Sequence, residues 1–465
     1  MKISIRQSVR LLIRTSIIDL LNRFLSLTGI SKAVLASLLV KSWQMLAGAL
    51  TLILVAHFFT SEEQGYFYTF NSVIGLQIIF EMGLSFVILQ FSGHYFASLS
   101  WLKLGAIKGD SSNVKKFLLL LNHAVFWYAL AAIIMALLLL TAGLYFFSHQ
   151  KSNLSEISWQ LPWIFLVIFT AFNLLCTPSL AAIEGSGQVV NVNRLRLAQG
   201  VVSSFLSWIL LVLGARLWIA VIPVLVASTT SSYWLLRFFP ILIKSVVKVD
   251  RAEGKDIFSW KHEVWPMQWR IAISWISGYF IFQLFTPVLF YYHGAVEAGK
   301  MGMSIAIATI LTSVGFVWMQ ANSPSLTKLV SNSNWKEFDR TFFQLFMQSS
   351  AFVFISIVTI VTCLSLFKGV SILERVLPLL EMIMLLIAFS ISHIVGALAY
   401  YLRLHKREPF MVLSVIGAII LTASILYFGR IYGARGMVIS LLSINVLYGL
   451  PTALWLWNKL RREWH

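Results

Sequence analysis

Residues 117–140, FLLLLNHAVFWYALAAIIMALLLL, form an apolar run that contains no Lys, Arg, Asp or Glu. A helix needs about 20 mostly apolar residues to cross the hydrocarbon core of a membrane, so this run is long enough. Across the 465 residues, 58% are hydrophobic and only 12% are charged, and the mean hydropathy is +0.82. This composition excludes a soluble globular protein and predicts an all-α polytopic membrane protein.

Similar runs recur along the whole chain and predict about twelve transmembrane helices. They are continuous, whereas the strands of a membrane β-barrel show a weak alternation of apolar and polar residues. We expect spans at residues 33–58, 67–92, 116–147, 160–183, 190–213, 216–238, 266–290, 300–323, 343–367, 376–401, 409–428 and 435–457.

Lys and Arg residues are enriched in cytoplasmic connections, so their distribution predicts the orientation of the chain. With twelve spans, two of the 36 cations, Lys41 and Arg270, fall inside spans. Seven more lie on one side: Lys151, Arg216, Lys300, Lys368, Arg375, Arg430 and Arg435. The remaining 27 lie on the side that holds both termini, which predicts that both termini are cytoplasmic.

The second half of the chain repeats features of the first. Residues 61–66 (SEEQGY) and 295–300 (AVEAGK) each join the first two spans of their half, with a period of about 235 residues. Six spans per half give both halves the same orientation, as in parallel transporter repeats. We therefore expect two six-helix lobes around a central cavity, at residues 33–238 and 266–465, with a cytoplasmic linker at 239–265.

The extramembrane segments are short. Residues 1–32 mix cations with apolar residues and predict a cytoplasmic, interfacial amphipathic helix. The net charge of +18 follows from the topology and from attraction to anionic membrane lipids, so we expect no nucleic-acid partner. Cys176 and Cys363 lie in predicted spans, and we expect no disulfide, metal site or other cofactor. No connection can hold a catalytic domain, so we expect a transporter and not an enzyme.

Two ionisable side chains lie inside the first two spans, where insertion costs about 2.5–3.5 kcal/mol each. Lys41 lies in the cytoplasmic part of the first span, and Gln44 continues its helix face. Glu81 lies near the middle of the second span, with Gln77 one turn before it. Glu81 is expected to pair with Lys41, and this pairing is compatible with a role in ion coupling; Lys41 can instead extend to the interface.

The seventh span opens with Gln268, Trp269 and Arg270. Arg270 lies in the cytoplasmic part of the first span of the second half, as Lys41 does in the first half. Lining a cavity between the lobes, Lys41 and Arg270 would form a cationic floor suited to a diphosphate. In the plainer interpretation, Arg270 extends to the interface and Trp269 only packs. We predict a substrate site formed by Lys41, Gln44, Gln77, Glu81, Gln268, Trp269 and Arg270, with Glu81 as the ion-coupling residue.

Several motifs resemble a known family. The motifs AHFFT at 56–60, E-x-Q-G-Y-x-Y-x-F at 62–70 and EMGLS at 81–85 resemble the start of the Wzx-type O-antigen and polysaccharide flippases. These belong to the multidrug/oligosaccharidyl-lipid/polysaccharide exporter superfamily. PMQWR at 266–270 and WISGY at 275–279 are similar to members that act in lipopolysaccharide biosynthesis. The length and the twelve predicted spans agree along the whole chain, although fewer cations lie deep in spans than a strongly anionic glycan requires.

The resemblance implies that the protein moves undecaprenyl-diphosphate-linked oligosaccharide from the cytoplasmic to the periplasmic leaflet of a bacterial inner membrane. It also implies alternating access, coupling to H⁺ or Na⁺, and the polysaccharide polymerase machinery as a candidate partner. A multidrug exporter of the same superfamily is the alternative that Glu81 favours. A membrane-embedded glycan polymerase or ligase is a further alternative, but it needs a larger outer loop than those predicted here. A structural scaffold would not need Lys41 or Glu81.

Overall fold

The computed structural model describes residues 32–149, 157–249, 258–366, 373–405 and 409–464. The interfacial helix predicted for residues 1–32 therefore lies, apart from its last residue, outside the described part of the chain. Within the described ranges, eight helical segments are long and apolar enough to cross a membrane, and two bent helix pairs pass the same test. The protein is thus an all-α, multi-pass membrane protein.

Two of these ten segments are too long for one crossing. Gln160–Val212 has 53 residues and Met411–Trp464 has 54. At 1.5 Å per residue each would extend about 80 Å, more than twice the bilayer core. The first is interrupted at Gly187 (φ 92°) and the second at Gly433 (φ 59°). Dividing both at these residues gives twelve passes in the described chain, the number that the sequence predicts.

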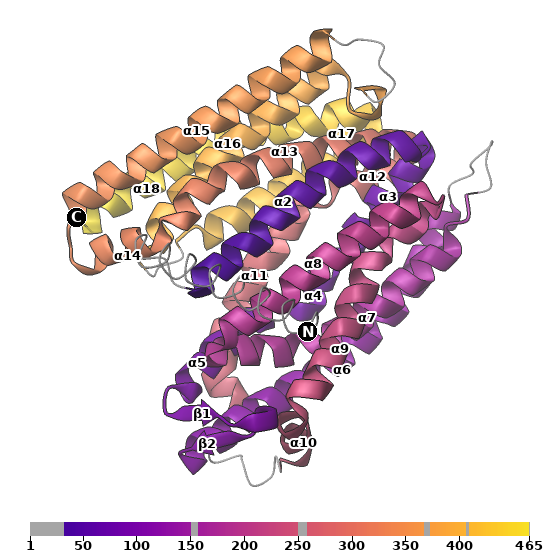
Figure 1. Ribbon diagram of the computed structural model, residues 1–465. Coiled ribbons are helices and arrows are strands. Elements are labelled where there is room, and N and C mark those ends of the chain that lie inside the picture. The colour runs from indigo at the N-terminus through magenta and orange to yellow at the C-terminus, as the bar shows by residue number, and fades with distance from the viewer. Residues whose placement is uncertain (1–31, 150–156, 250–257, 367–372, 406–408, 465) are drawn as a thin grey trace, which may run out of the picture.

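The N-terminal lobe contains most of the first half of the chain (Figure 1). Its elements are α2 (Lys32–Phe58), α3 (Ser61–Ile74), α4 (Gln77–Glu81), α5 (Leu84–Phe96), β1 (Leu99–Trp101), β2 (Ile107–Gly109), α6 (Ser111–Ser148), α7 (Gln160–Ile183), α8 (Val189–Val212), α9 (Ile222–Phe238) and α10 (Pro240–Lys248). β1 and β2 pair as an antiparallel hairpin, with Ser100 opposite Lys108. The sequence did not predict this hairpin or α10.

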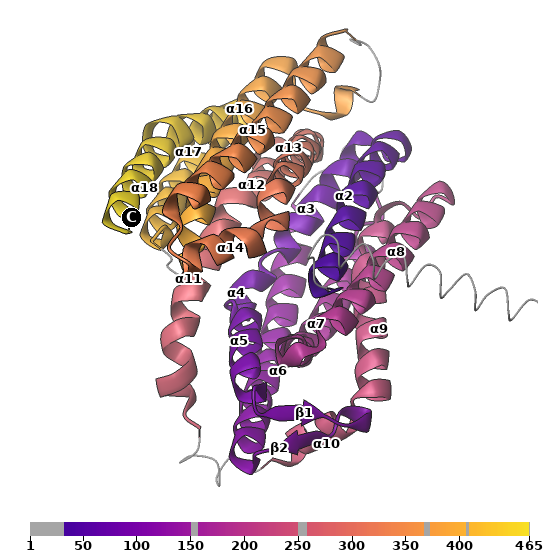
Figure 2. The same cartoon turned by 60° about the vertical axis from the view of Figure 1, so that its left-hand side comes forward.

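The C-terminal lobe is formed by α11 (Trp265–Phe282), α12 (Phe285–His293), α13 (Ala295–Ala321), α14 (Ser323–Ser331), α15 (Trp335–Leu366), α16 (Leu379–Arg403), α17 (Met411–Ile444) and α18 (Leu450–Trp464). The two lobes come together near α3 and α13. They diverge toward the ends that carry the β1–β2 hairpin and α14 (Figures 1 and 2). These diverging ends are the ones that the distribution of Lys and Arg predicts to be cytoplasmic.

The second and seventh predicted spans are not continuous helices, which corrects the boundaries 67–92 and 266–290. The second is divided into α3, α4 and α5 and bends by 45°, because Met82 and Gly83 both take left-handed backbone angles (φ 51° and 62°). The seventh is divided into α11 and α12 and bends by 42°. Pro287 lies in the first turn of α12, where the missing N–H of proline is tolerated.

The start of α3 is fixed by its own sequence. Thr60 accepts a hydrogen bond from the Glu63 backbone N–H, and the Glu63 carboxylate accepts one from the Thr60 N–H. This reciprocal capping box satisfies two backbone donors at the helix end. The Glu63 carboxylate also pairs with Arg216 at 3.1 Å, which ties α3 to the turn before α9.

Helices α3 and α13 approach so closely that glycine is required at the contact. A Cβ on Gly65 would overlap the carbonyl of Ala295, and one on Gly299 would stand 2.9 Å from the Gly65 nitrogen and 3.2 Å from the Ser61 oxygen. In the sequence repeat, Gly65 corresponds to Gly299 and Ser61 to Ala295. Gly65 thus contacts Ala295, and Gly299 contacts Ser61, the residue equivalent to Ala295. A two-fold axis produces this reciprocal pattern.

A set of polar contacts holds the lobes together at the same end. Gln64 donates to the carbonyls of Gly299 and Arg375, both at 2.9 Å. The Arg375 guanidinium donates to the Phe59 carbonyl at 2.7 Å and to the Ser61 hydroxyl at 3.0 Å. We call these residues, together with Gly65, the outer closure. It seals the end of the molecule that the charge distribution predicts to face outward.

Replacing Gly65 by leucine is expected to force the outer closure open, because the new side chain has no space beside Ala295. Spin labels at Leu213→Cys and Glu374→Cys, in a background without Cys176 and Cys363, should show a longer mean distance than in the parent. Gly278→Leu is the matched control, because a Cβ at Gly278 meets no atom within 4 Å. An unchanged distance in Gly65→Leu would contradict the closure.

Candidate functional site

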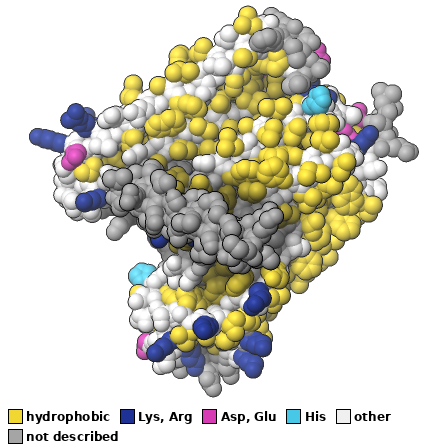
Figure 3. All heavy atoms as spheres, viewed as in Figure 1, with side chains coloured by type: hydrophobic (Ala, Val, Ile, Leu, Met, Phe, Trp, Pro, Cys, Tyr) yellow, Lys and Arg dark blue, Asp and Glu magenta, His cyan; other side chains and the backbone are white. Residues whose placement is uncertain are grey.

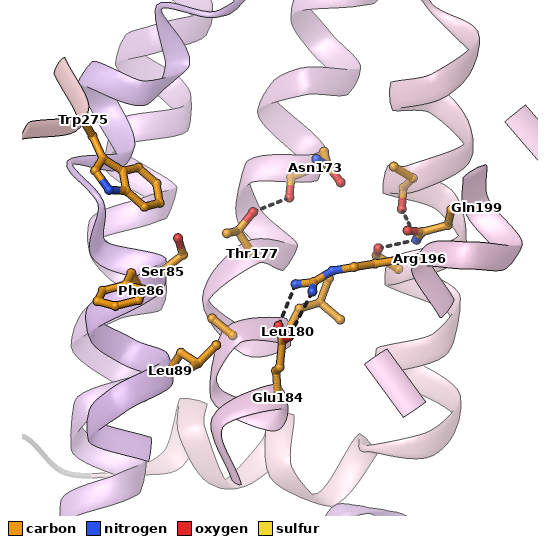
Figure 4. A pocket seen from close by; sticks show the side chains of 13 residues that line it. Ser85, Phe86, Leu89, Asn173, Thr177, Leu180, Glu184, Arg196, Gln199 and Trp275 are labelled. Atoms are coloured by element: carbon orange, nitrogen blue, oxygen red, sulfur yellow. Dashed lines mark hydrogen bonds and ion pairs between the residues drawn. The ribbon is translucent and has the colours of Figure 1, made fainter. Parts of the chain in front are cut away.

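A cavity of about 420 Å³ lies inside the N-terminal lobe, on the diverging side (Figure 4). Its walls come from α5, α7, α8 and α9, and α11 of the other lobe contributes one residue. The lining residues are Ser85, Phe86, Leu89, Asn173, Thr177, Leu180, Ala181, Glu184, Arg196, Gln199, Ala227, Ser231 and Trp275. The volume lies in the range of small-molecule sites in proteins.

An arginine–carboxylate pair lies in the wall of the cavity. Arg196 reaches from α8 to Glu184 at the end of α7 and donates two hydrogen bonds, at 3.0 and 2.7 Å (Figure 4). The two parallel bonds are the fork geometry that a guanidinium forms with carboxylates and phosphates. Glu184 is 13% exposed and Arg196 is 42% exposed, so the cation faces open space while the acid is mostly covered.

Neutral polar groups line the rest of the cavity. The Gln199 amide donates to the hydroxyls of Thr230 and Ser231, both at 2.9 Å, and this network joins α8 to α9. Thr177 donates to the carbonyl of Asn173 on the same helix at 3.2 Å. The amide and hydroxyl groups of Asn173, Thr177 and Gln199 can both donate and accept hydrogen bonds, as sugar hydroxyls do.

Glu81 lies directly behind this wall. Ser85, which lines the cavity, donates to the Glu81 carboxylate, and Tyr128 from α6 donates to the same oxygen at 3.4 Å. Ser85 and Glu81 are four residues apart but lie on either side of the Met82–Gly83 break. The break in the helix therefore places an acidic group one hydrogen bond away from the cavity.

The C-terminal lobe closes one side of the site through α11. Trp275 faces the cavity from α11 (Figure 4). A Cβ on Gly83 would overlap Ile271 and approach Trp275, so the break in the second span also makes room for α11. Movement of one lobe against the other must therefore change the shape of the cavity at Trp275.

The two residues predicted on the first span lie apart from this cavity. Lys41 donates to the side-chain oxygen of Gln320 at the end of α13, so it connects α2 of the N-terminal lobe to α13 of the C-terminal lobe. Gln44 is exposed and makes no side-chain hydrogen bond within the described residues. Lys41 and Glu81 do not form an ion pair in this structure, because each has the other partners named above.

The residues predicted on the seventh span lie on α11, between one and two helical turns before Trp275. Gln268 is 1% exposed, and its side-chain oxygen is buried without a hydrogen-bond partner. The Arg270 guanidinium stacks over the Trp269 ring at 5.5 Å and remains exposed. Gln77 is half-buried on α4. None of the seven predicted residues lines the 420 Å³ cavity, and their role in substrate binding stays a prediction.

Glu184 and Arg196 were not predicted as site residues from the sequence. Arg196 was counted among the cytoplasmic cations, and Glu184 was not singled out. The available signal was an acid and a base twelve residues apart, on either side of a predicted turn that contains Gly185 and Gly187. Within the described residues, no group of three or more His, Cys, Asp or Glu could hold a metal ion.

Comparison with known proteins finds similarity in structure but not in sequence. No family model matches the chain, and no curated protein matches it. A solved structure of the lipid II flippase MurJ in an inward closed conformation is 15% identical, with 91% of this chain and 86% of that chain covered and a TM-score of 0.57. An inward-facing multidrug resistance MATE family transporter of the MOP superfamily is 14% identical, with 93% and 99% covered and a TM-score of 0.57.

The outward-facing structure of a MATE family transporter gives nearly the same values: 13% identity, 93% and 95% coverage, and a TM-score of 0.56. At these identities the similarity shows the fold and leaves the substrate open. The protein has the two-lobed, all-α membrane fold that these transporters share, with about twelve transmembrane helices.

Proposed function

We propose that the protein is a flippase that moves undecaprenyl-diphosphate-linked oligosaccharide from the cytoplasmic to the periplasmic leaflet of a bacterial inner membrane. The proposal includes cytoplasmic termini, alternating access and coupling to H⁺ or Na⁺, as in the Wzx-type family that the sequence motifs resemble. The observation that carries it is the partly exposed Arg196 in a polar cavity on the predicted cytoplasmic side.

Arg196 is suited to bind the diphosphate of such a substrate. Its guanidinium already makes two parallel bonds to the Glu184 carboxylate, at 3.0 and 2.7 Å. A phosphate can take the same two bonds, because both acceptors present two oxygens in a plane. Substrate would then release Glu184 from Arg196, so that binding rearranges the turn between α7 and α8.

The remaining lining residues suit a neutral or weakly charged glycan. Asn173, Thr177 and Gln199 supply amides and hydroxyls, and Trp275 supplies an aromatic face. A site of this kind fixes a sugar by several hydrogen bonds and leaves the lipid chain in the bilayer. This agrees with the small number of cations inside the spans.

Alternating access requires that the outer closure opens at modest cost. Four hydrogen bonds of Gln64 and Arg375 hold it, and each contributes on the order of 1 kcal/mol net. These four bonds together contribute a few kcal/mol, and the packing of Tyr66 and Phe147 on Phe290 adds to them, so substrate binding must favour the open state by more than the bonds alone. Binding of an ion at Glu81 would change its hydrogen bond to Ser85, which lines the same cavity. This contact supports the proposed role of Glu81 in coupling.

The predicted residues extend this path. Lys41 and Arg270, with Gln44, Gln77, Gln268 and Trp269, would guide the diphosphate between the lobes toward Arg196. Lys41 bonds to Gln320 and Arg270 stacks on Trp269, so within the described residues both cations have uncharged partners. Such cations can bind a phosphate without first breaking an ion pair.

One observation favours a multidrug exporter instead. Two acids, Glu81 and Glu184, lie at or directly behind the cavity, and Trp275 faces it. Carboxylates and an aromatic ring are the groups that bind organic cations. The exposed guanidinium of Arg196 opposes this use, and transport assays decide between the two.

In a strain deleted for the gene, long-chain surface glycan is expected to disappear and to return with the wild-type protein. Arg196→Gln should restore about a tenth of it or less, because the bidentate cation is lost, while Arg196→Lys should restore an intermediate level. Gel banding of the glycan measures this at matched expression, with Lys41→Ala, Glu81→Gln and Arg270→Ala tested alongside. Full rescue by Arg196→Gln excludes this site, and altered drug tolerance with unchanged glycan supports the exporter.

A cysteine in the cavity should react from the cytoplasmic side alone. Thr177→Cys, without the native cysteines, is expected to react with a membrane-impermeant methanethiosulfonate in inside-out vesicles and not in right-side-out cells. Thr170→Cys is the control, because Thr170 is 2% exposed on the same helix and should react in neither. Reaction of Thr177→Cys from the outer side alone would reverse the proposed orientation.

A further inference from the structure

A compact foot lies at the end of the N-terminal lobe, outside the spans. It consists of the β1–β2 hairpin, its connecting turn and α10 (Figures 1 and 2). Trp101 packs edge-on against Phe239 with ring centres 5.4 Å apart, and a Cβ on Gly105 would stand 2.8 Å from the Phe239 Cα. The hairpin and α10 therefore form one rigid unit.

The outer surface of this foot is unusually apolar for a segment outside the spans. Leu102 and Leu104 in the hairpin turn are 51% and 48% exposed, and Ile241 and Val247 on α10 are 40% and 74% exposed. Leu104 also has a left-handed backbone angle (φ 57°), which a non-glycine residue adopts only under strain. Two exposed leucines, one of them strained, beside exposed apolar residues of α10 indicate a binding surface.

Cations are interleaved with these apolar side chains. Lys103 and Lys108 lie on the hairpin, and Lys244 and Lys248 lie on the exposed face of α10. Figure 3 shows Lys and Arg side chains between hydrophobic ones at this end of the molecule. α10 buries Leu242 and Val246 against the lobe, so Ile241, Lys244 and Val247 lie on its free side. A free surface that combines Lys with apolar side chains can contact anionic headgroups and the edge of the acyl chains together.

We propose that the foot is a binding site for the anionic headgroups of the cytoplasmic leaflet, with Leu102 and Leu104 inserted at the boundary between headgroups and acyl chains. Charge complementarity selects this occupant, because the four lysines present one sign of charge beside the membrane. Asp110, the acid that follows β2, is engaged by the start of α6, where it accepts a bond from the Asn113 N–H at 2.9 Å. The proposal concerns the foot alone and does not depend on the transported substrate.

The test places a bimane label at Leu104→Cys, in full-length protein whose native cysteines are replaced by alanine. The protein is reconstituted in bilayers with or without phosphatidylglycerol, and both contain lipids brominated on the acyl chains. We expect quenching of the label, stronger by roughly twofold or more with the anionic lipid. Replacing Lys103, Lys108, Lys244 and Lys248 by glutamine should remove this difference.

A second variant controls for net charge. Replacing Lys328, Lys336, Arg340 and Arg462 by glutamine removes the same number of cations from the C-terminal lobe, and should leave the lipid dependence unchanged. A label that brominated lipid does not quench, but that aqueous iodide does, would overturn the proposal and leave a soluble acidic protein as the occupant. Quenching that is equal with and without phosphatidylglycerol would overturn the role of the lysines.

Discussion

The architecture depends on the close approach of two backbones, at Gly65 on α3 and Gly299 on α13. No side chain fits between the helices at these positions, and each glycine lies against the chain segment that the other helix contributes. Because a membrane offers little hydrophobic force to hold helices together, contacts between small residues carry much of the association. The contact lies at one end only, so the lobes diverge from it toward the other end and leave the cavity accessible on that side.

The same contact explains why the closure can be both tight and reversible. The packing around the two glycines is apolar and leaves no specific partner unpaired when the lobes separate. The hydrogen bonds of Gln64 and Arg375 are lost on opening, but bonds to water can replace them. Both residues bond mainly to backbone carbonyls, so no buried charge is left behind when the lobes separate. Opening therefore breaks these hydrogen bonds and must also separate Phe290 of α12 from Tyr66 and Phe147 of the N-terminal lobe.

Hydropathy was sufficient to predict the number of spans, because bilayer thickness fixes the length of a span, and the repeat at 61–66 and 295–300 predicted the two lobes. They could not predict the break at Met82–Gly83, since Met is an ordinary helix former and only contact with Ile271 of the other lobe requires the bend. They also could not predict the cavity. Arg196 and Glu184 meet through a turn whose geometry the sequence does not specify, and a cation there looks like any other cytoplasmic charge. The residues predicted to bind substrate were chosen by depth in the membrane, and depth does not reveal which face of a helix points inward.

The foot and the cavity are not independent, because one side chain joins them. Trp101 of β1 donates to the Ser186 hydroxyl at 3.1 Å, and Ser186 lies in the turn that begins with Glu184. The turn contains a left-handed glycine, Gly187, and packs closely on α5, because a Cβ on Gly185 would stand 2.1 Å from the Leu89 oxygen. If the foot binds the membrane as proposed, its displacement would be transmitted by the hairpin to the turn that contains Glu184, the partner of Arg196. The lipid surface and the substrate would then act on the same turn from opposite sides.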